Sequence, residues 1–125
     1  MKEHRSGKKR PDAPPGFSCR GRIWIEKDGE TYLGVGRMVL LARIKDFGSI
    51  SAAAKSMDMS YKHAWDLVDS MNRHAPEPLV STSKGGKGGG GALLTEAGER
   101  AIGQFAALLE RLEAFLTEET ARLQL

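Results

Sequence analysis

The chain has 125 residues, of which 40% are apolar and 28% charged, and its formal net charge is +3. This composition supports one modest hydrophobic core, so we expect a single folded unit rather than two domains. It contains no run of 18 uncharged apolar residues and no apolar leader, so we expect a cytoplasmic protein without a membrane span or a signal peptide. The single cysteine, Cys19, has no second cysteine for a disulfide or a thiolate metal site, and we expect it to be a small packing residue.

Basic residues are unevenly distributed along the chain. Residues 1–16 carry five Lys or Arg against two acids, whereas residues 96–125 carry three against six. The prolines of residues 1–16, and their lack of large apolar side chains, predict a disordered basic arm. Such an arm can follow a DNA backbone, or it can be an untethered solubilising tail.

Alternating apolar and polar residues over residues 17–27 predict a strand whose inner face carries Cys19, Ile23 and Ile25. The Asp-Gly pair at 28–29 favours a left-handed turn, and residues 31–33 can form a short partner strand. We therefore expect an N-terminal β-hairpin that covers a helical core.

Three helices are predicted next. Apolar residues recur with helical spacing from Val35 to Phe47, and Gly48 is the expected end of that helix. Ser49 or Ser51 can cap a short second helix that runs to about Met57. The third helix is expected from Ser60, which can cap it, to about Arg73.

The third helix has one apolar and one polar face. Its core face is expected to carry Ala64, Val68 and Met71, while Trp65 lies on the flank, where we expect it to be mostly packed. The first turn of such a helix is the part that meets base edges and phosphates in the major groove. We therefore predict that the DNA-binding residues of this region are Ser49, Ser51, Ser60, Tyr61, Lys62, His63 and Asp66.

A glycine-rich segment separates two short apolar runs, Leu79-Val80 and residues 92–94, which predicts a hairpin wing. Its glycines let backbone amides approach phosphates, and its lysines supply charge, so the predicted contacts are Lys84, Gly86 and Lys87. A flexible linker is the alternative. A nucleotide-binding loop is rejected because Gly86-Lys87 is followed by Gly88 instead of Ser or Thr.

No catalytic or metal-binding pattern is found in the sequence. The histidines at positions 4, 63 and 74 lack metal-ligand spacing, and no serine lies in a strand-turn-helix elbow. We therefore expect a protein that is not an enzyme and that needs no metal or cofactor.

The last predicted helix begins after Thr95, a candidate cap, and reaches about Leu123. Its apolar residues alternate at spacings of three and four, which predicts a dimerisation seam made of Ile102, Phe105, Leu109, Leu112 and Leu116. A two-fold dimer would place two recognition helices in successive major grooves. The alternative is a helix that lies wholly on its own domain.

Several of these segments together resemble a known family. They are residues 48–54 (GSISAAA), 60–66 (SYKHAWD), 71–72, 78–80, 85–91 (GGKGGGG) and 94–95. Over roughly residues 17–120 the chain resembles the N-terminal DNA-binding domain of ModE-type molybdate-responsive regulators and, more remotely, the winged helix-turn-helix of LysR-type regulators. The resemblance implies a homodimer in which Ser60, Tyr61 and Lys62 face the groove and the wing lysines contact the backbone. The family binds molybdate in later modules that this chain does not contain, so we expect no molybdate site here.

The sequence thus predicts a mainly α fold with small β-hairpins, namely a winged helix-turn-helix with a long C-terminal dimerisation helix. Residues 1–16 are the basic arm, 17–95 the DNA-binding domain and 96–125 the dimerisation helix. The expected function is sequence-specific binding of double-stranded DNA in transcription regulation. A winged-helix adaptor that binds another protein is the main alternative, and a small-molecule switch or an enzyme with a pocket beneath the wing is a further one.

Overall fold

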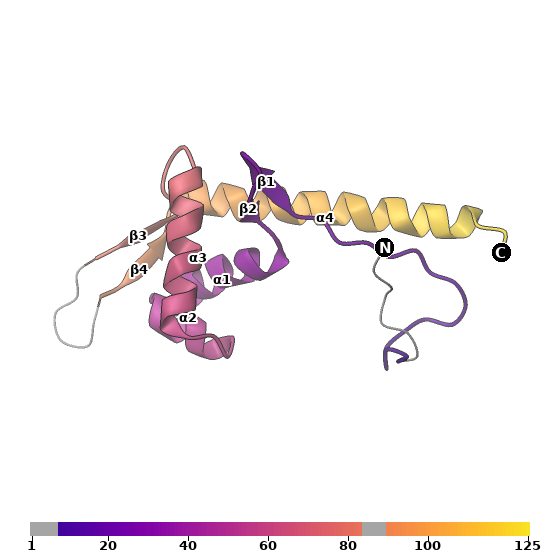
Figure 1. Ribbon diagram of the computed structural model, residues 1–125, viewed down its shortest axis with the longest axis horizontal. Coiled ribbons are helices and arrows are strands. Elements are labelled where there is room, and N and C mark those ends of the chain that lie inside the picture. The colour runs from indigo at the N-terminus through magenta and orange to yellow at the C-terminus, as the bar shows by residue number, and fades with distance from the viewer. Residues whose placement is uncertain (1–7, 84–89) are drawn as a thin grey trace.

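The structure of the chain is a computed structural model that describes residues 8–83 and 90–125. Within these residues there are four helices and two antiparallel hairpins, shown in Figure 1. In chain order the elements are β1 (Ile25–Lys27), β2 (Glu30–Leu33), α1 (Val35–Phe47), α2 (Ile50–Ser56), α3 (Tyr61–His74), β3 (Val80–Thr82), β4 (Ala92–Leu94) and α4 (Glu96–Arg122). The small share of strand and the long last helix confirm the mainly α class. In the described part of the chain, no helix is both long and apolar enough to span a membrane.

The first predicted strand is shorter than expected. Cys19, Ile23 and Ile25 are half-buried, as the predicted alternation of apolar and polar residues requires. Only Ile25–Lys27, however, pairs with β2. Residues before Ile25 contact α4 instead: the backbone N–H of Cys19 donates to Oγ1 of Thr120 at 2.8 Å. Residues 8–16 form neither helix nor strand, and residues 1–7 of the predicted arm lie outside the described residues.

The core forms between α1, α3 and α4. Helix α1 ends at Gly48, whose φ of 73° is the left-handed conformation predicted for that position. Its side chains Leu40, Leu41 and Ile44 are wholly buried, and they share one cluster with Met71 of α3 and Phe105 of α4. The predicted boundaries of α1 are confirmed, since the helix covers Val35–Phe47.

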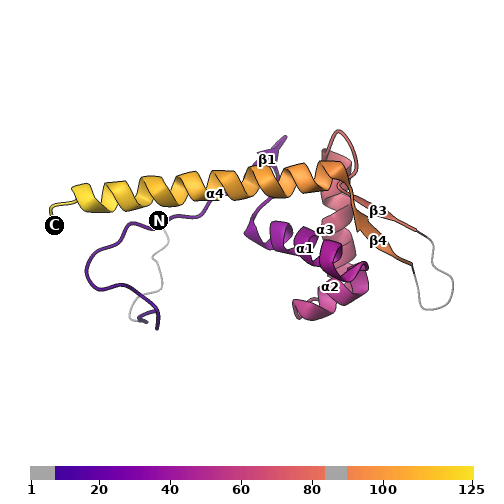
Figure 2. The same cartoon turned by 180° about the vertical axis from the view of Figure 1, so that it is seen from behind.

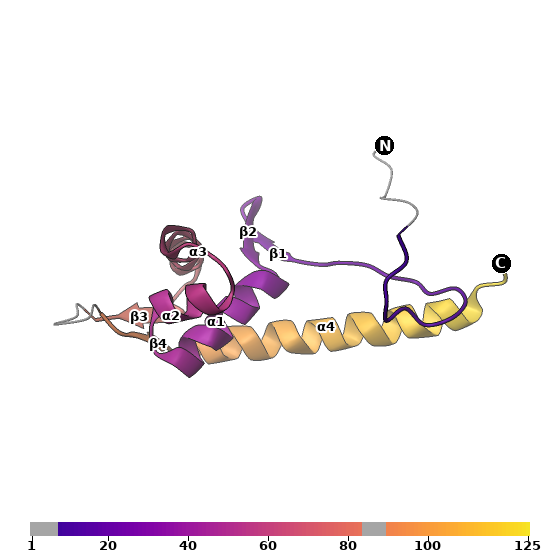
Figure 3. The same ribbon diagram turned by 90° about the horizontal axis from the view of Figure 1, so that it is seen from below.

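Helix α4 is much longer than the body on which it packs. Its N-terminal half lies along α1 and the base of the β3–β4 hairpin, as Figure 2 shows. Its C-terminal half extends beyond the other helices, accompanied by the N-terminal segment before β1 (Figure 3). That segment covers Leu116, which is buried, whereas Phe115 and Leu123 stay exposed.

Candidate nucleic-acid interface

The α2–α3 unit is two helices joined by a tight turn. Asp58 adopts a left-handed φ of 52°, and the Met59 N–H donates to the Ala54 carbonyl at 3.0 Å, which reverses the chain within four residues. Small side chains allow close packing here, since Ala53 and Ala64 are fully buried. The sequence therefore fixes the angle between α2 and α3 through local backbone geometry and a small-residue contact.

Both helices of this unit are capped by serines, as predicted. Ser49 accepts from the Ala52 N–H at 3.0 Å, which settles the choice between Ser49 and Ser51. Ser60 accepts from the His63 N–H at 3.1 Å. Ser51 is exposed on the first turn of α2 and caps nothing.

The face of α3 opposite the core carries charges of both signs. Lys62 Nζ lies 3.0 Å from Asp66 Oδ2, and Arg73 Nε lies 3.0 Å from Asp69 Oδ2, both with i,i+4 spacing. These ion pairs are largely exposed, so each contributes little stability and can open at small cost. The face is therefore locally neutral in the free protein, yet Lys62 can exchange its carboxylate partner for a phosphate.

Trp65 lies on the flank of α3, where the sequence analysis places it, but it is more exposed than expected. The prediction that it is mostly packed is wrong, because 45% of its surface is exposed. Ala64 and Val68 are buried, so the core face of α3 is centred on them and Trp65 lies at its edge. Tyr61, one turn earlier, is 56% exposed. Two large aromatic side chains thus share the outward stripe of α3, and only the first of them was predicted as a contact.

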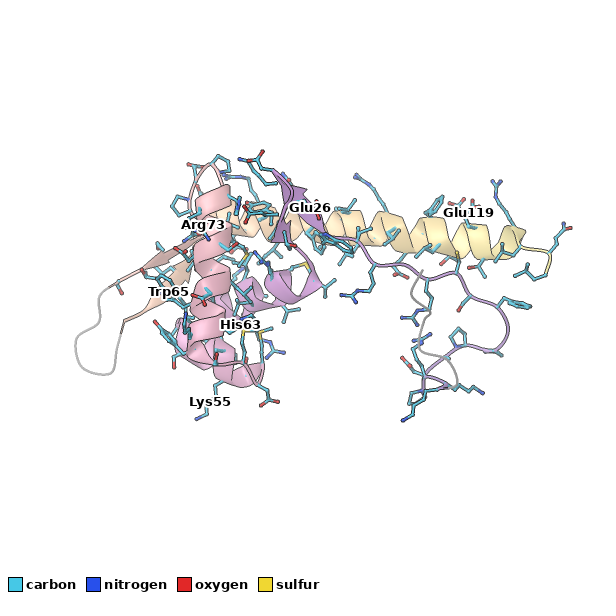
Figure 4. All side chains as sticks on the ribbon, in the orientation of Figure 1. Glu26, Lys55, His63, Trp65, Arg73 and Glu119 are labelled. Atoms are coloured by element: carbon cyan, nitrogen blue, oxygen red, sulfur yellow. The ribbon has the colours of Figure 1, made fainter. Side chains whose placement is uncertain are left out.

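His63 points to the other side of α3. Two helical positions turn the side chain by about 200°, so His63 and Trp65 flank the helix on opposite sides, as Figure 4 shows. His63 lines a pocket of about 660 Å³ together with Met59, Trp24 and Arg37. It therefore stands apart from the stripe that carries Tyr61, Lys62 and Trp65.

Arg37 is the half-buried cation of that pocket. Its Nη1 donates to Ser70 Oγ at 3.2 Å, which ties α1 to α3, and burial lowers the pKa of the Arg37 guanidinium. An arginine remains charged after such a shift, so Arg37 acts as a cationic tether between the two helices.

The β3–β4 hairpin is anchored to α3 by one side chain. Asn72 accepts from the Leu79 and Val80 N–H groups at 2.8 Å and 3.2 Å, and its Nδ2 donates to the Val80 carbonyl at 2.9 Å. A second anchor joins the Ala92 N–H to the Gly48 carbonyl at 2.9 Å. The hairpin therefore projects from the same body as α3, while its predicted contacts Lys84, Gly86 and Lys87 lie outside the described residues.

The residues predicted for dimerisation do not share one environment. Phe105 is fully buried in the chain's own core, so it offers no surface to a second copy. Ile102 and Leu109 are partly covered by the same core, Leu112 lines the pocket beside His63, and Leu116 is buried beside the chain's own N-terminal segment. The large apolar side chains left exposed here instead include Leu108 and Phe115 on α4 and Leu123 directly after it. Apolar residues spaced three and four apart are also typical of a helix that packs within its own chain. In the first half of α4 they pack against the chain's own core.

In the described ranges 8–83 and 90–125, no cluster of three His, Cys, Asp or Glu side chains could hold a metal ion. The features present are a capped two-helix unit, an outward aromatic and charged stripe on its second helix, and a neighbouring hairpin. This arrangement is suited to binding a macromolecule.

The chain is similar to several curated proteins whose names refer to molybdenum or to transcription regulation. No family model matches the chain. The chain is 46% identical over 90 residues to the molybdenum-pterin-binding protein MopB of Rhodobacter capsulatus, covering 72% of this chain and 33% of that protein. It is 43% identical over 106 residues to the molybdenum transport protein ModE of Azotobacter vinelandii, covering 79% of this chain and 39% of that protein.

It is also 47% identical over 77 residues to the DNA-binding transcriptional dual regulator ModE of Escherichia coli K12, covering 62% of this chain and 29% of that protein. The chain thus spans about a third of the length of the curated relatives that it matches. The relatives named as regulators are not enzymes, in line with the prediction for this chain.

Proposed function

We propose that this chain is a DNA-binding unit of a ModE-type transcription regulator and that it binds duplex DNA as a winged helix-turn-helix. In this proposal α3 enters the major groove by its N-terminal turn, and the β3–β4 hairpin is the wing. The observation that carries the proposal is the outward stripe of α3. Ser60 caps this helix, and Asn72 ties it to the neighbouring β3–β4 hairpin. The E. coli relative, named as a DNA-binding regulator, supports it.

Binding proceeds by capture and then readout. Lysines of the arm and the wing, with Lys62, contact phosphates and release counterions, which gives affinity for any sequence. Tyr61 and its neighbours then contact base edges. The acids Asp66 and Asp69 repel phosphates, so they keep non-specific affinity low and favour an arrangement in which their face meets bases. The unit needs no cofactor for this step.

A second copy of the chain completes the site. Phe115, in the C-terminal half of α4, and Leu108, near the middle of the helix, are exposed, and apolar side chains of this size on one helix favour a helix–helix interface. In the proposed homodimer these residues, with Leu112, pack across a two-fold axis. The two α3 helices then lie about 34 Å apart, or a multiple of that, which predicts a palindromic site.

The test is selection of duplexes from a random library, followed by binding titrations of the selected and a scrambled duplex at several salt concentrations. We expect one enriched palindrome, bound about a thousand-fold or more tightly than scrambled DNA, and an affinity that falls steeply with salt. Tyr61→Ala is expected to weaken the selected duplex more than the scrambled one, and Lys87→Ala to weaken both by similar factors.

The adaptor hypothesis rests on the neutral face of α3 and on Phe115, which is exposed in the second half of α4. It predicts no enriched sequence and no retention of any duplex at moderate salt. That outcome would overturn DNA binding.

A further inference from the structure

Trp65 is an exposed aromatic side chain with no structural role that the described residues account for. Within residues 8–83 and 90–125 its indole N–H has no hydrogen-bond partner, and almost half of its surface faces solvent. A tryptophan offers a large apolar area with one donor, and it is costly to leave in water unless a partner covers it. The placement of Trp65 on the stripe of α3 therefore points to a contact in the complex.

The position of Trp65 on α3 defines what it can reach. It follows Tyr61 by one turn, and helical side chains lean toward the N-terminus of their helix. The indole of Trp65 thus covers the turn that holds Tyr61 and Lys62, which is the end that enters the groove in the proposed function. It is not at the far end, where Arg73 pairs with Asp69.

The chemistry of the site selects one class of partner group. An indole cannot form an ion pair with a phosphate, and its large apolar surface favours an apolar partner group. In the major groove the 5-methyl group of thymine is the apolar group that distinguishes one base from the others. An apolar side chain at this point of the helix gains contact area from a thymine and loses it at a cytosine or an uracil.

We infer that Trp65 is a specificity-determining residue that recognises a thymine 5-methyl group in the major groove. This inference rests on the proposed function, because it needs α3 to enter the groove. It adds a residue, a mode of recognition and a base preference that DNA binding by α3 does not by itself require.

The experiment replaces single thymines of the selected duplex with deoxyuridine, which removes the methyl group and leaves base pairing unchanged. For the unmodified chain we expect a loss of about three- to ten-fold at one or two positions of each half-site, the range for one methyl group and its packing. Trp65→Ala is expected to bind the thymine duplex more weakly by a similar factor and to be indifferent to uridine at those positions. Trp65→Phe, which keeps an apolar ring, should retain part of the uridine effect.

Trp24→Ala is the matched control. Trp24 is 54% exposed, but it lies on the His63 side of α3, and its Nε1 donates to Glu26 at 3.0 Å. This variant should keep the full uridine sensitivity. Circular dichroism of all variants should be unchanged, since both indoles are outside the core.

The outcomes separate the two proposals. A chain indifferent to uridine at every position, or a Trp65→Ala variant that keeps the uridine effect, overturns the role of Trp65 while DNA binding by α3 stands. A chain that binds no duplex overturns the proposed function, and the role of Trp65 with it.

Discussion

Two phenylalanines on α4 meet opposite environments. In the first half of the helix Phe105 has no exposed surface and contacts the shared core, whereas in the second half Phe115 leaves 56% of its surface exposed. Both belong to one continuous amphipathic helix that begins at the Thr95 cap. The comparison teaches that an apolar repeat along a helix has different partners at its two ends. Here the first half packs on the chain's own core, whereas the second half contacts the N-terminal segment at Leu116 and Thr120 and leaves Phe115 exposed.

The largest effect that tests this division is expected at Phe105. Phe105→Ala removes a fully buried ring, so we expect a loss of about 3–5 kcal/mol in the free energy of unfolding. Urea titration followed by circular dichroism at low protein concentration measures it. A loss below about 1 kcal/mol would mean that the first half of α4 does not hold the core together.

Gly98 offers a second test in the first half of the helix. A Cβ there would lie 2.4 Å from the Leu79 carbonyl oxygen and from Leu94 Cδ1, so Gly98→Ala forces α4 away from the base of the hairpin. We expect a loss of about 1–3 kcal/mol in the free energy of unfolding, despite the better helix propensity of alanine.

Gly103→Ala is the matched control on the same helix. In the described residues nothing lies within 4 Å of a Cβ at position 103, so this change should stabilise the chain by about 0.5–1 kcal/mol. Thermal melts of the two variants measure both effects. A stabilising Gly98→Ala would contradict the close contact of α4 with residue 79.

Phe115 tests the second half of α4. Phe115→Ala should leave unfolding of the single chain nearly unchanged, because the side chain lies outside the core cluster. If a second copy covers it, self-association should weaken about thirty-fold, which corresponds to about 2 kcal/mol. Sedimentation equilibrium over a concentration series measures the change. An unaltered association constant would remove Phe115 from the interface.

Local signals in the sequence predict most helix boundaries, because they act over a few residues. Ser60 and Thr95 cap their helices, and Gly48 takes the left-handed conformation that ends α1. The residues that cover each face of a helix come from distant parts of the chain, so local sequence signals do not predict them. The exposure of Trp65 follows from how α3 is rotated on the core, and the burial of Phe105 follows from the packing of α4 on α1 and on the rest of the core cluster.

One anchor of the candidate site and one contact of the N-terminal segment could not be predicted from hydrophobic periodicity, for the same reason. The Asn72 anchor joins α3 to the start of β3 through three hydrogen bonds, although Asn72 follows no motif for such a role in the chain. The partner of the Cys19 N–H is Thr120, nearly the whole chain away. Such contacts depend on the tertiary fold, so a single sequence does not predict them.

The smallest effect is expected at the ion pair that joins α1 to the first turn of α4. Lys45 Nζ lies 2.7 Å from Glu99 Oε2, and the hydrogen bond and charge of Glu99 raise the pKa of Lys45 above its usual 10.5. A raised pKa means that the folded chain holds this proton more tightly than the unfolded one. The pair therefore stabilises the fold below pH 10.5, and this contribution is lost as the pH rises through the raised pKa.

Glu99→Gln should lower the melting temperature slightly near pH 8, and the difference from the unmodified chain should shrink once Lys45 loses its proton. Glu96→Gln is the control, since Glu96 also lies in the first turn of α4 but forms no ion pair with any residue of 8–83 or 90–125. It reports the loss of charge at the helix N-terminus alone, an effect that does not depend on Lys45. Equal losses for the two variants near pH 8, or a Glu99→Gln effect unchanged at high pH, would show that the pair does not hold the first half of α4 on α1.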